Sequence, residues 1–129
     1  SSEANGLLTM IRKDWKHASE VTIIEGILDP QEGEAIQIVQ IPSKRIHLVH
    51  VHLHWVHRLA QGKTVLRRCE ELLGDQPHHY PIALVAGDLN GDNAVCQQFG
   101  WSHLKDALEE SDQSEQIPTF YPDPSTVEG

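Results

Sequence analysis

Short apolar runs divide the first half of this chain into segments that predict β-strands joined by tight turns. The predicted strands cover residues 6–13, 21–24, 35–41 and 45–54. The second of them is β-branched throughout, which is typical of strands. Proline, glycine and acidic residues between positions 29 and 34 indicate a turn, so the second and third strands predict a β-hairpin. The first half therefore predicts a meander of three or four strands.

The apolar spacing becomes helical after His57. Apolar residues there recur every three or four positions, with Arg and Glu between them, at Leu59, Val65, Leu66, Cys69, Leu72 and Leu73. This spacing predicts an amphipathic helix. Gly74 lies where such a helix would end.

An uninterrupted apolar run begins after Pro81 and continues through Ala86 to Gly87. A run of this length between turn residues is typical of a strand buried on both faces of a sheet. Gly87 removes the Cβ where the strand leaves the sheet, so backbone or ligand can approach closely.

The last part of the chain is mostly polar. Residues 94–99 predict a short helix with Asp92 or Asn93 as its N-cap, and residues 104–108 predict one more helical turn. Residues 111–129 carry three prolines and predict irregular structure. Strands, then a helix, then a buried strand predict an α/β or α+β layered sandwich.

Length and composition narrow the class of protein. The chain of 129 residues has room for one core, so we expect residues 1–129 to form a single domain. No stretch is long and apolar enough for a membrane span, and no targeting signal is predicted. Cys69 and Cys96 lack CxxC spacing and indicate core thiols in a reducing, intracellular compartment. A formal charge of −9 disfavours strong non-specific nucleic-acid binding, although weak or metal-assisted contact with a phosphodiester stays open.

The sequence Gly87-Asp88-Leu89-Asn90 offers a carboxylate and an amide at the end of the buried strand. If the strand continues, Asp88 and Asn90 project to the same side. Such a pair suits a divalent metal and a phosphate oxygen. The alternative is a loop in which Asp88 caps a turn.

Three histidines, His50, His52 and His54, share one side of the predicted strand over residues 45–54 by the alternation of strand side chains. Three functions are open for them. Alternating histidines on a strand can hold zinc or another transition metal. One of them can contact a scissile phosphate as an acid or hydrogen-bond donor. The third interpretation is a polar strand face with histidines hydrogen-bonded under a loop.

The order of these motifs resembles the endonuclease/exonuclease/phosphatase superfamily, the DNase I-like metal-dependent phosphodiesterases. Gly87-Asp88-Leu89-Asn90 matches the family's Gly-Asp-x-Asn, and His50-Val51-His52-Leu53 is similar to its Asn-x-His-Leu. A Gly-led strand ending in Arg-Lys, a helix with Arg and Gln near its start, and Thr119-Phe120 follow the family's order. The resemblance covers the central part of that domain, and the endonucleases associated with retroelement reverse transcriptases are one branch that fits.

The resemblance implies two packed, mixed or antiparallel β-sheets with flanking helices, and phosphodiester hydrolysis by a water activated next to Mg²⁺ or Mn²⁺. Asp88 would bind the metal and orient the attacking water. Asn90 would hydrogen-bond the phosphate as charge builds on it, and His52 would contact the scissile phosphate. His50 and Thr119 would contact or support the phosphate site.

The sequence also departs from that family. His50 stands where the family has Asn, and the family's metal-binding Glu and C-terminal Asp-His pair have no counterpart. General-base hydrolysis needs a base oriented by a second group and a metal held by more than one carboxylate. We therefore expect an incomplete domain, a fragment or degenerate member of the superfamily, that by itself hydrolyses no phosphodiester at an appreciable rate.

Three functions follow as hypotheses. The chain is part of a metal-dependent nuclease or other phosphodiesterase, with DNA, RNA or another phosphoester as substrate. Alternatively it is a non-catalytic structural or protein-interaction subunit, whose exposed sheet edges a partner protein covers. The third hypothesis is a transition-metal-binding protein built on the histidine cluster.

Overall fold

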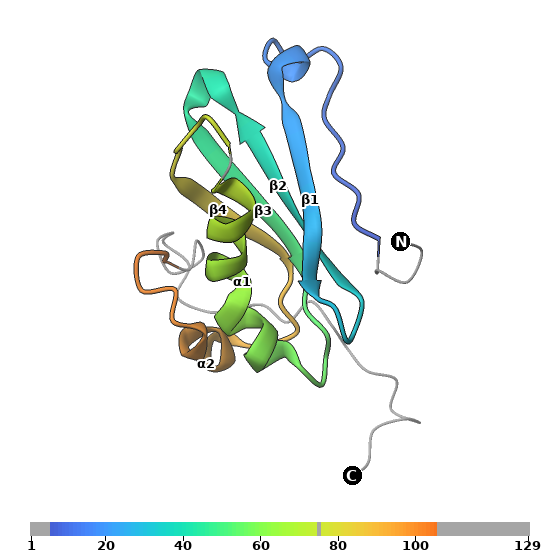
Figure 1. The fold of residues 1–129 in the computed structure, drawn as a ribbon, viewed down its shortest axis with the longest axis vertical. Helices are drawn as coiled ribbons and strands as arrows, with labels where there is room; N and C mark the ends of the chain where they lie inside the picture. The colour runs from blue at the N-terminus through green and yellow to red at the C-terminus, as the bar shows by residue number, and fades with distance from the viewer. Residues whose placement is uncertain (1–5, 75, 106–129) are drawn as a thin grey trace.

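The computed structural model describes residues 6–74 and 76–105, which form an α+β fold with one mixed sheet (Figure 1). The four strands lie in the order β1-β2-β3-β4 and cover Thr22–Asp29, Glu34–Ile41, Ile46–His52 and Ile82–Asp88. The first three are antiparallel, and β4 is parallel to β3. Helix α1, Arg58–Leu73, connects β3 to β4 and packs on one face of the sheet. The remaining helices are short: Ala18–Glu20, Pro42–Lys44, α2 at Asn93–Cys96, and Gln97–Phe99.

The predicted hairpin and long helix are confirmed. The hairpin β1–β2 turns at residues 30–33, where Gly33 takes a φ of 74° that glycine adopts without a steric penalty. Helix α1 ends next to Gly74, as expected. In the short helix α2, the Asp92 carboxylate accepts a hydrogen bond from the Val95 amide at 2.9 Å, so Asp92 is the N-cap.

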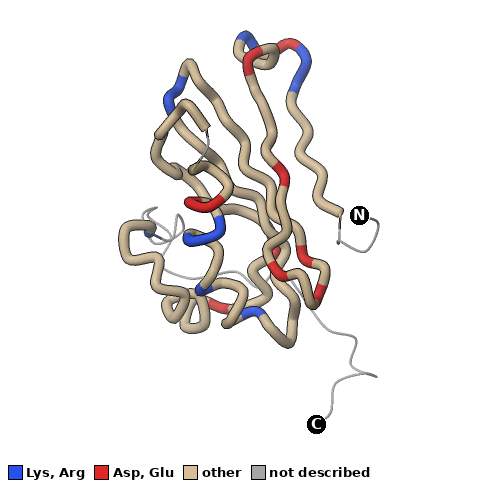
Figure 2. Tube along the Cα trace, in the orientation of Figure 1, with Lys and Arg blue, Asp and Glu red and all other residues tan. Residues whose placement is uncertain are grey.

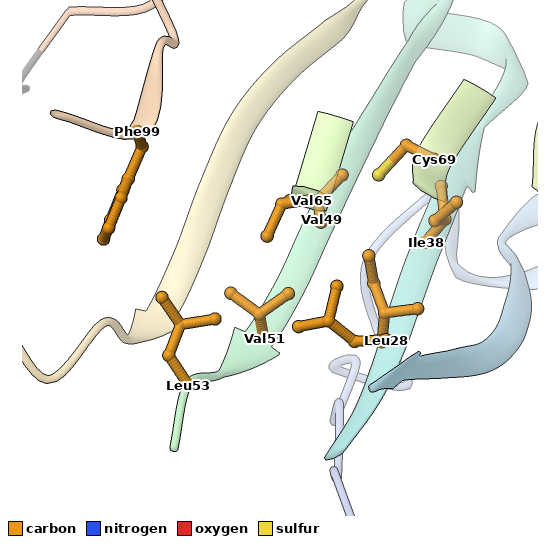
Figure 3. Close-up of a cluster of buried hydrophobic side chains, with 9 residues drawn as sticks. Leu28, Ile38, Val49, Val51, Leu53, Val65, Cys69 and Phe99 are labelled. Atoms are coloured by element: carbon orange, nitrogen blue, oxygen red, sulfur yellow. The ribbon is translucent and has the colours of Figure 1, made fainter. Parts of the chain in front are cut away.

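The core lies between α1 and the sheet. Val49, Val51 and Leu53, the odd positions at the end of β3 and just after it, are buried against Val65 and Cys69 of α1. Figure 3 shows these side chains converging, with Phe99 closing one end of the cluster. The odd positions therefore face the helix, because alternate strand residues point to opposite faces.

The expectation that β4 is buried on both faces is wrong. β4 is an edge strand that pairs with β3, and Leu84 is 46% exposed. Its apolar run reflects burial of Ile82 and Val85 beside the helix-facing core, while Leu84 points to the face that α1 does not cover. An apolar run cannot by itself distinguish one covered face from two.

The expected first strand over residues 6–13 is also wrong, because this segment joins no strand ladder. It is held to the sheet through side chains instead: the Gln37 amide donates to the Leu7 carbonyl at 3.0 Å. Between this segment and the sheet lies an open groove of about 670 Å³, lined among others by Met10, Ile11, Trp15, Val39, Ile41 and Leu48.

Among residues 6–74 and 76–105 there is one β-sheet, so the second sheet of the expected sandwich is not among the described residues. The helical turn expected at residues 104–108 lies partly, and the irregular segment 111–129 wholly, outside the described residues. No helix in the described part of the chain has the length and apolar character needed to cross a membrane.

Candidate functional site

His52 and Asp88 meet at the end of the two parallel strands. They are register partners on β3 and β4, and His52 Nε2 lies 3.7 Å from Asp88 Oδ2. Their side chains are 49% and 62% exposed, so a ligand from solvent can reach both. The carboxyl ends of adjacent parallel strands are a common place for binding sites in α/β proteins. The sequence predicted both residues, and the structure brings them together.

Gly87 sets the position of Asp88. It has a φ of 126°, and a Cβ built on it would lie 1.9 Å from the Val51 carbonyl oxygen. A side chain at this position would therefore push β4 away from β3. Glycine permits the close approach of the two strands that places Asp88 beside His52, as the sequence predicted for this position.

β4 ends at Asp88, so the strand does not continue to Asn90 and the condition for the two side chains to share a side is not met. Asn90 has a left-handed φ of 49°, a conformation that Asn tolerates better than most residues. Its backbone N–H donates to Asp88 Oδ1 at 2.9 Å, and its side-chain Nδ2 donates to the Leu53 carbonyl at 2.6 Å. Asp88 thus does cap a turn, as the loop interpretation predicted. Nδ2 carries two N–H groups, and among the described residues only the Leu53 carbonyl accepts from it, which leaves the second N–H for a ligand.

The contacts of His50 in the structure are with residues other than this pair. His50 Nδ1 lies 3.4 Å from both Thr9 Oγ1 and Gln37 Oε1, a position typical of a histidine that ties residues 6–12 to the sheet. Thr119 lies outside the described residues.

His54 belongs to a second cluster that the sequence did not predict. β3 ends at His52, so strand alternation no longer orients His54, and it turns toward Glu32 in the β1–β2 turn. Glu32 Oε1 lies 3.0 Å from His57 Nε2, and Glu32 Oε2 lies 3.7 Å from His54 Nε2. One ligand atom from each residue lies within 4.8 Å of the other two. The His-x-x-His spacing was visible in the sequence, but nothing in it indicated that the Glu32 turn lies alongside.

A buried glutamine holds this end of the sheet. Gln61 of α1 is 2% exposed, its Oε1 accepts from the His54 amide at 2.7 Å, and its Nε2 donates to Asp29 Oδ2 at 3.0 Å. The hydrogen bond from Gln61 is the main cause that holds the pKa of Asp29 below its ordinary value. One side chain therefore joins the end of β1 to the loop between β3 and α1.

Positive charge does not gather at the site. Figure 2 shows Lys and Arg along the N-terminal segment, in the turn before β3 and along α1. Arg58 lies over the ring of Trp55 at 4.4 Å from its centroid, and Trp55 is 63% exposed.

Comparison with protein-family models, with curated proteins and with solved structures gives no match for this chain. What can be said of the site therefore follows from its geometry. Asp88 supplies a carboxylate oxygen, His52 an imidazole and Asn90 an amide N–H within one exposed corner. Such a set can bind an anionic oxygen and, through Asp88, a cation beside it.

Proposed function

We propose that this chain is a fragment or degenerate member of the DNase I-like phosphodiesterases, in which His52, Asp88 and Asn90 form the phosphate-binding part of a hydrolytic site. The observation that carries the proposal is the register pairing of His52 with Asp88, with Nε2 and Oδ2 3.7 Å apart at an exposed strand end. Both residues lie in the two motifs that carry the resemblance to that family.

Each residue has a role that its contacts allow. His52 donates a hydrogen bond to a phosphate oxygen from Nε2. Asn90 donates its remaining amide N–H as negative charge grows on the phosphate. The Asn90 backbone N–H fixes the orientation of the Asp88 carboxylate through Oδ1. The other oxygen, Oδ2, accepts a hydrogen bond from the attacking water.

A Mg²⁺ or Mn²⁺ ion fits this site in part. Mg²⁺ in phosphoryl sites is often held by one or two carboxylates together with waters and phosphate oxygens, and Asp88 can be one of these ligands. Such an ion, when bound, would neutralise charge on the phosphate. Among residues 6–74 and 76–105, Asp88 belongs to no group of three close His, Cys, Asp or Glu side chains.

The described residues therefore supply most of the groups needed to bind a phosphate but only part of those needed to activate a water. In that part of the chain, no third His, Cys, Asp or Glu forms a cluster with His52 and Asp88. General-base catalysis needs such a partner to orient the base. Binding without appreciable turnover is the expected behaviour.

The test measures binding and turnover separately. A short oligonucleotide or bis(p-nitrophenyl) phosphate is titrated with Mg²⁺ into the labelled chain while the NMR signals of the His52 ring and Asn90 side chain are followed. Both signals are expected to shift, and Asp88→Asn is expected to reduce the response. His79→Gln is the matched control, because His79 is exposed and lies outside the site. Absence of any shift at His52 and Asn90 overturns the proposal.

Turnover is then measured with Mg²⁺ and with Mn²⁺, using Asp88→Ala as control. No hydrolysis above the Asp88→Ala background is expected. Hydrolysis that Asp88→Ala abolishes would refute the incompleteness of the site and would establish an active phosphodiesterase.

A second candidate, a protein-interaction subunit, is favoured by the face of the sheet opposite α1. Leu8, Met10 and Leu84 are 75%, 83% and 46% exposed, and the groove beside residues 9–16 has an apolar lining. Exposed apolar patches next to an open edge strand are typical of interaction surfaces. A monomer that stays monodisperse at high concentration and unfolds cooperatively would count against this candidate.

A further inference from the structure

We propose that Glu32, His54 and His57 form a binding site for a divalent transition-metal ion of the zinc type, separate from the His52–Asp88 pair. This proposal does not depend on phosphodiester chemistry. It concerns the contact between the β1–β2 turn, which supplies Glu32, and the loop between β3 and α1, which supplies the two histidines.

The spacing of the ligand atoms fits a tetrahedral ion after a small contraction. With metal–ligand bonds of about 2.0 Å, tetrahedral ligand atoms lie roughly 3.3 Å apart. Here Glu32 contacts the two histidines through different carboxylate oxygens: Oε1 lies 3.0 Å from His57 Nε2, and Oε2 lies 3.7 Å from His54 Nε2. With a single ligand atom from each of the three residues, no pair is more than 4.8 Å apart. The rings of His54 and His57 lie with centroids 5.0 Å apart. We expect the cluster to close by rotation of these partly exposed side chains.

Hydrogen bonds of Gln61 already hold the β1–β2 turn and the loop between β3 and α1 next to each other. The Gln61 side chain accepts a hydrogen bond from the His54 backbone amide and donates one to Asp29, which lies three residues before Glu32. The Gln61 backbone amide donates to the His57 carbonyl at 2.9 Å. Gln61 is buried, so these bonds are shielded from water. Outer-shell hydrogen bonds that fix ligand-bearing segments raise metal affinity, because less motion is lost on binding.

The protonation of His54 provides a specific marker of binding. Its Nδ1 accepts a hydrogen bond from the Val56 amide at 3.1 Å, so a neutral ring carries its proton on Nε2, facing Glu32. Binding of a metal at Nε2 moves that proton to Nδ1, and the Val56 amide then loses its acceptor. Val56 is 69% exposed, so water can take over as the acceptor.

The ligand set selects the class of ion. Two imidazoles and one carboxylate suit zinc and similar borderline metals, whereas Mg²⁺ prefers oxygen ligands in octahedral geometry. Three protein ligands also leave a fourth position for water or a substrate group. The same metal titration therefore distinguishes this site from Asp88, where Mg²⁺ is expected.

The test is a titration of the chain with Zn²⁺, in which calorimetry measures the affinity and NMR spectra record the signals of the backbone amides. We expect one ion bound with micromolar or tighter affinity, a large shift of the Val56 amide, and a rise in Tm of about 10 °C at a zinc concentration about 100 times the Kd. Glu32→Gln and His57→Gln are each expected to weaken binding by more than the roughly 10- to 100-fold that loss of an outer-shell partner causes. Mg²⁺ is expected to leave the Val56 amide unchanged.

The control for both variants is His79→Gln, the same kind of substitution at an exposed histidine outside the cluster. It is expected to keep the zinc affinity of the wild type. Zinc affinity that survives Glu32→Gln and His57→Gln overturns the proposal. The proposal is also overturned if His52→Gln loses zinc affinity while His57→Gln keeps it. Such a result would place the ion on the face of β3 that carries His52.

Discussion

The replacement of Gly87 by alanine tests the link between the strand contact and the site. Gly87 has a φ of 126°, and an added Cβ would lie 1.9 Å from the Val51 carbonyl oxygen. That carbonyl belongs to the backbone of β3, so it cannot rotate away as a flexible side chain would. The substitution must move β4 relative to β3.

Two effects set the magnitude. A conformation that glycine alone adopts readily costs another residue about 1–3 kcal/mol. Displacing β4 weakens ladder hydrogen bonds near the end of the strand, each with a net contribution of about 1 kcal/mol. We therefore expect Gly87→Ala to lower the free energy of unfolding by about 4 kcal/mol. With a urea m-value of about 2 kcal/mol per molar, this lowers the unfolding midpoint by about 2 M.

Gly100→Ala is the matched control. Gly100 also has a positive φ, of 80°, but nothing lies within 4 Å of its added Cβ. It should show the conformational effect alone, about 1–2 kcal/mol. Urea unfolding of both variants, with the NMR signals of His52 and Asp88 as a local readout, measures the difference.

The reasoning is refuted if both variants lose the same free energy, or if Gly87→Ala leaves the signals of His52 and Asp88 unchanged. Either result would show that β4 does not need its close contact with the Val51 carbonyl. The position of Asp88 beside His52 would then require another explanation.

Two further predictions concern titratable groups. Burial raises the pKa of the Cys69 thiol to about 12. At pH 8 iodoacetamide should therefore modify the half-buried Cys96 and leave Cys69 intact until urea unfolds the chain. Equal rates of modification of the two cysteines in the native protein would contradict this. The Gln61 hydrogen bond lowers the folded-state pKa of Asp29 below its ordinary 3.8, so its contribution to stability is present above that pH and is lost as the pH falls through the folded-state value. The excess stability of the wild type over Asp29→Asn should therefore shrink in acid unfolding experiments below pH 3.8, and a difference that stays constant or grows there would contradict the assignment.

Much of the local structure was predictable. The hairpin, β3, α1 and an N-cap at Asp92 or Asn93 follow from strand alternation, helical spacing and turn residues, which act over a few neighbouring positions. The structure selects Asp92. The segment 6–13 has the same apolar pattern as a strand, yet it is held by side-chain contacts such as that between Gln37 and Leu7. Whether an apolar segment joins a ladder depends on a partner strand, which a local pattern does not contain.

The site divides in the same way. Asp88, Asn90 and His52 could be selected from the sequence, because their residue types and positions at strand ends indicate chemistry. Their mutual placement depends on β4 running parallel to β3, which the intervening helix permits but the sequence pattern did not specify.

The sequence by itself determined the β1–β2 hairpin, β3, β4 and α1, and which side chains at the end of β4 are polar, but it also predicted a strand at residues 6–13 that does not form. The tertiary structure decided which residues meet. Glu32 and His57 are 25 positions apart, and only the folding of the β1–β2 turn beside the loop after β3 brings them to 3.0 Å. Strand alternation placed His54 with His50 and His52, but β3 ends at His52 and the loop turns His54 to Glu32. Contacts between distant segments depend on chain packing, and short-range patterns carry no information about it.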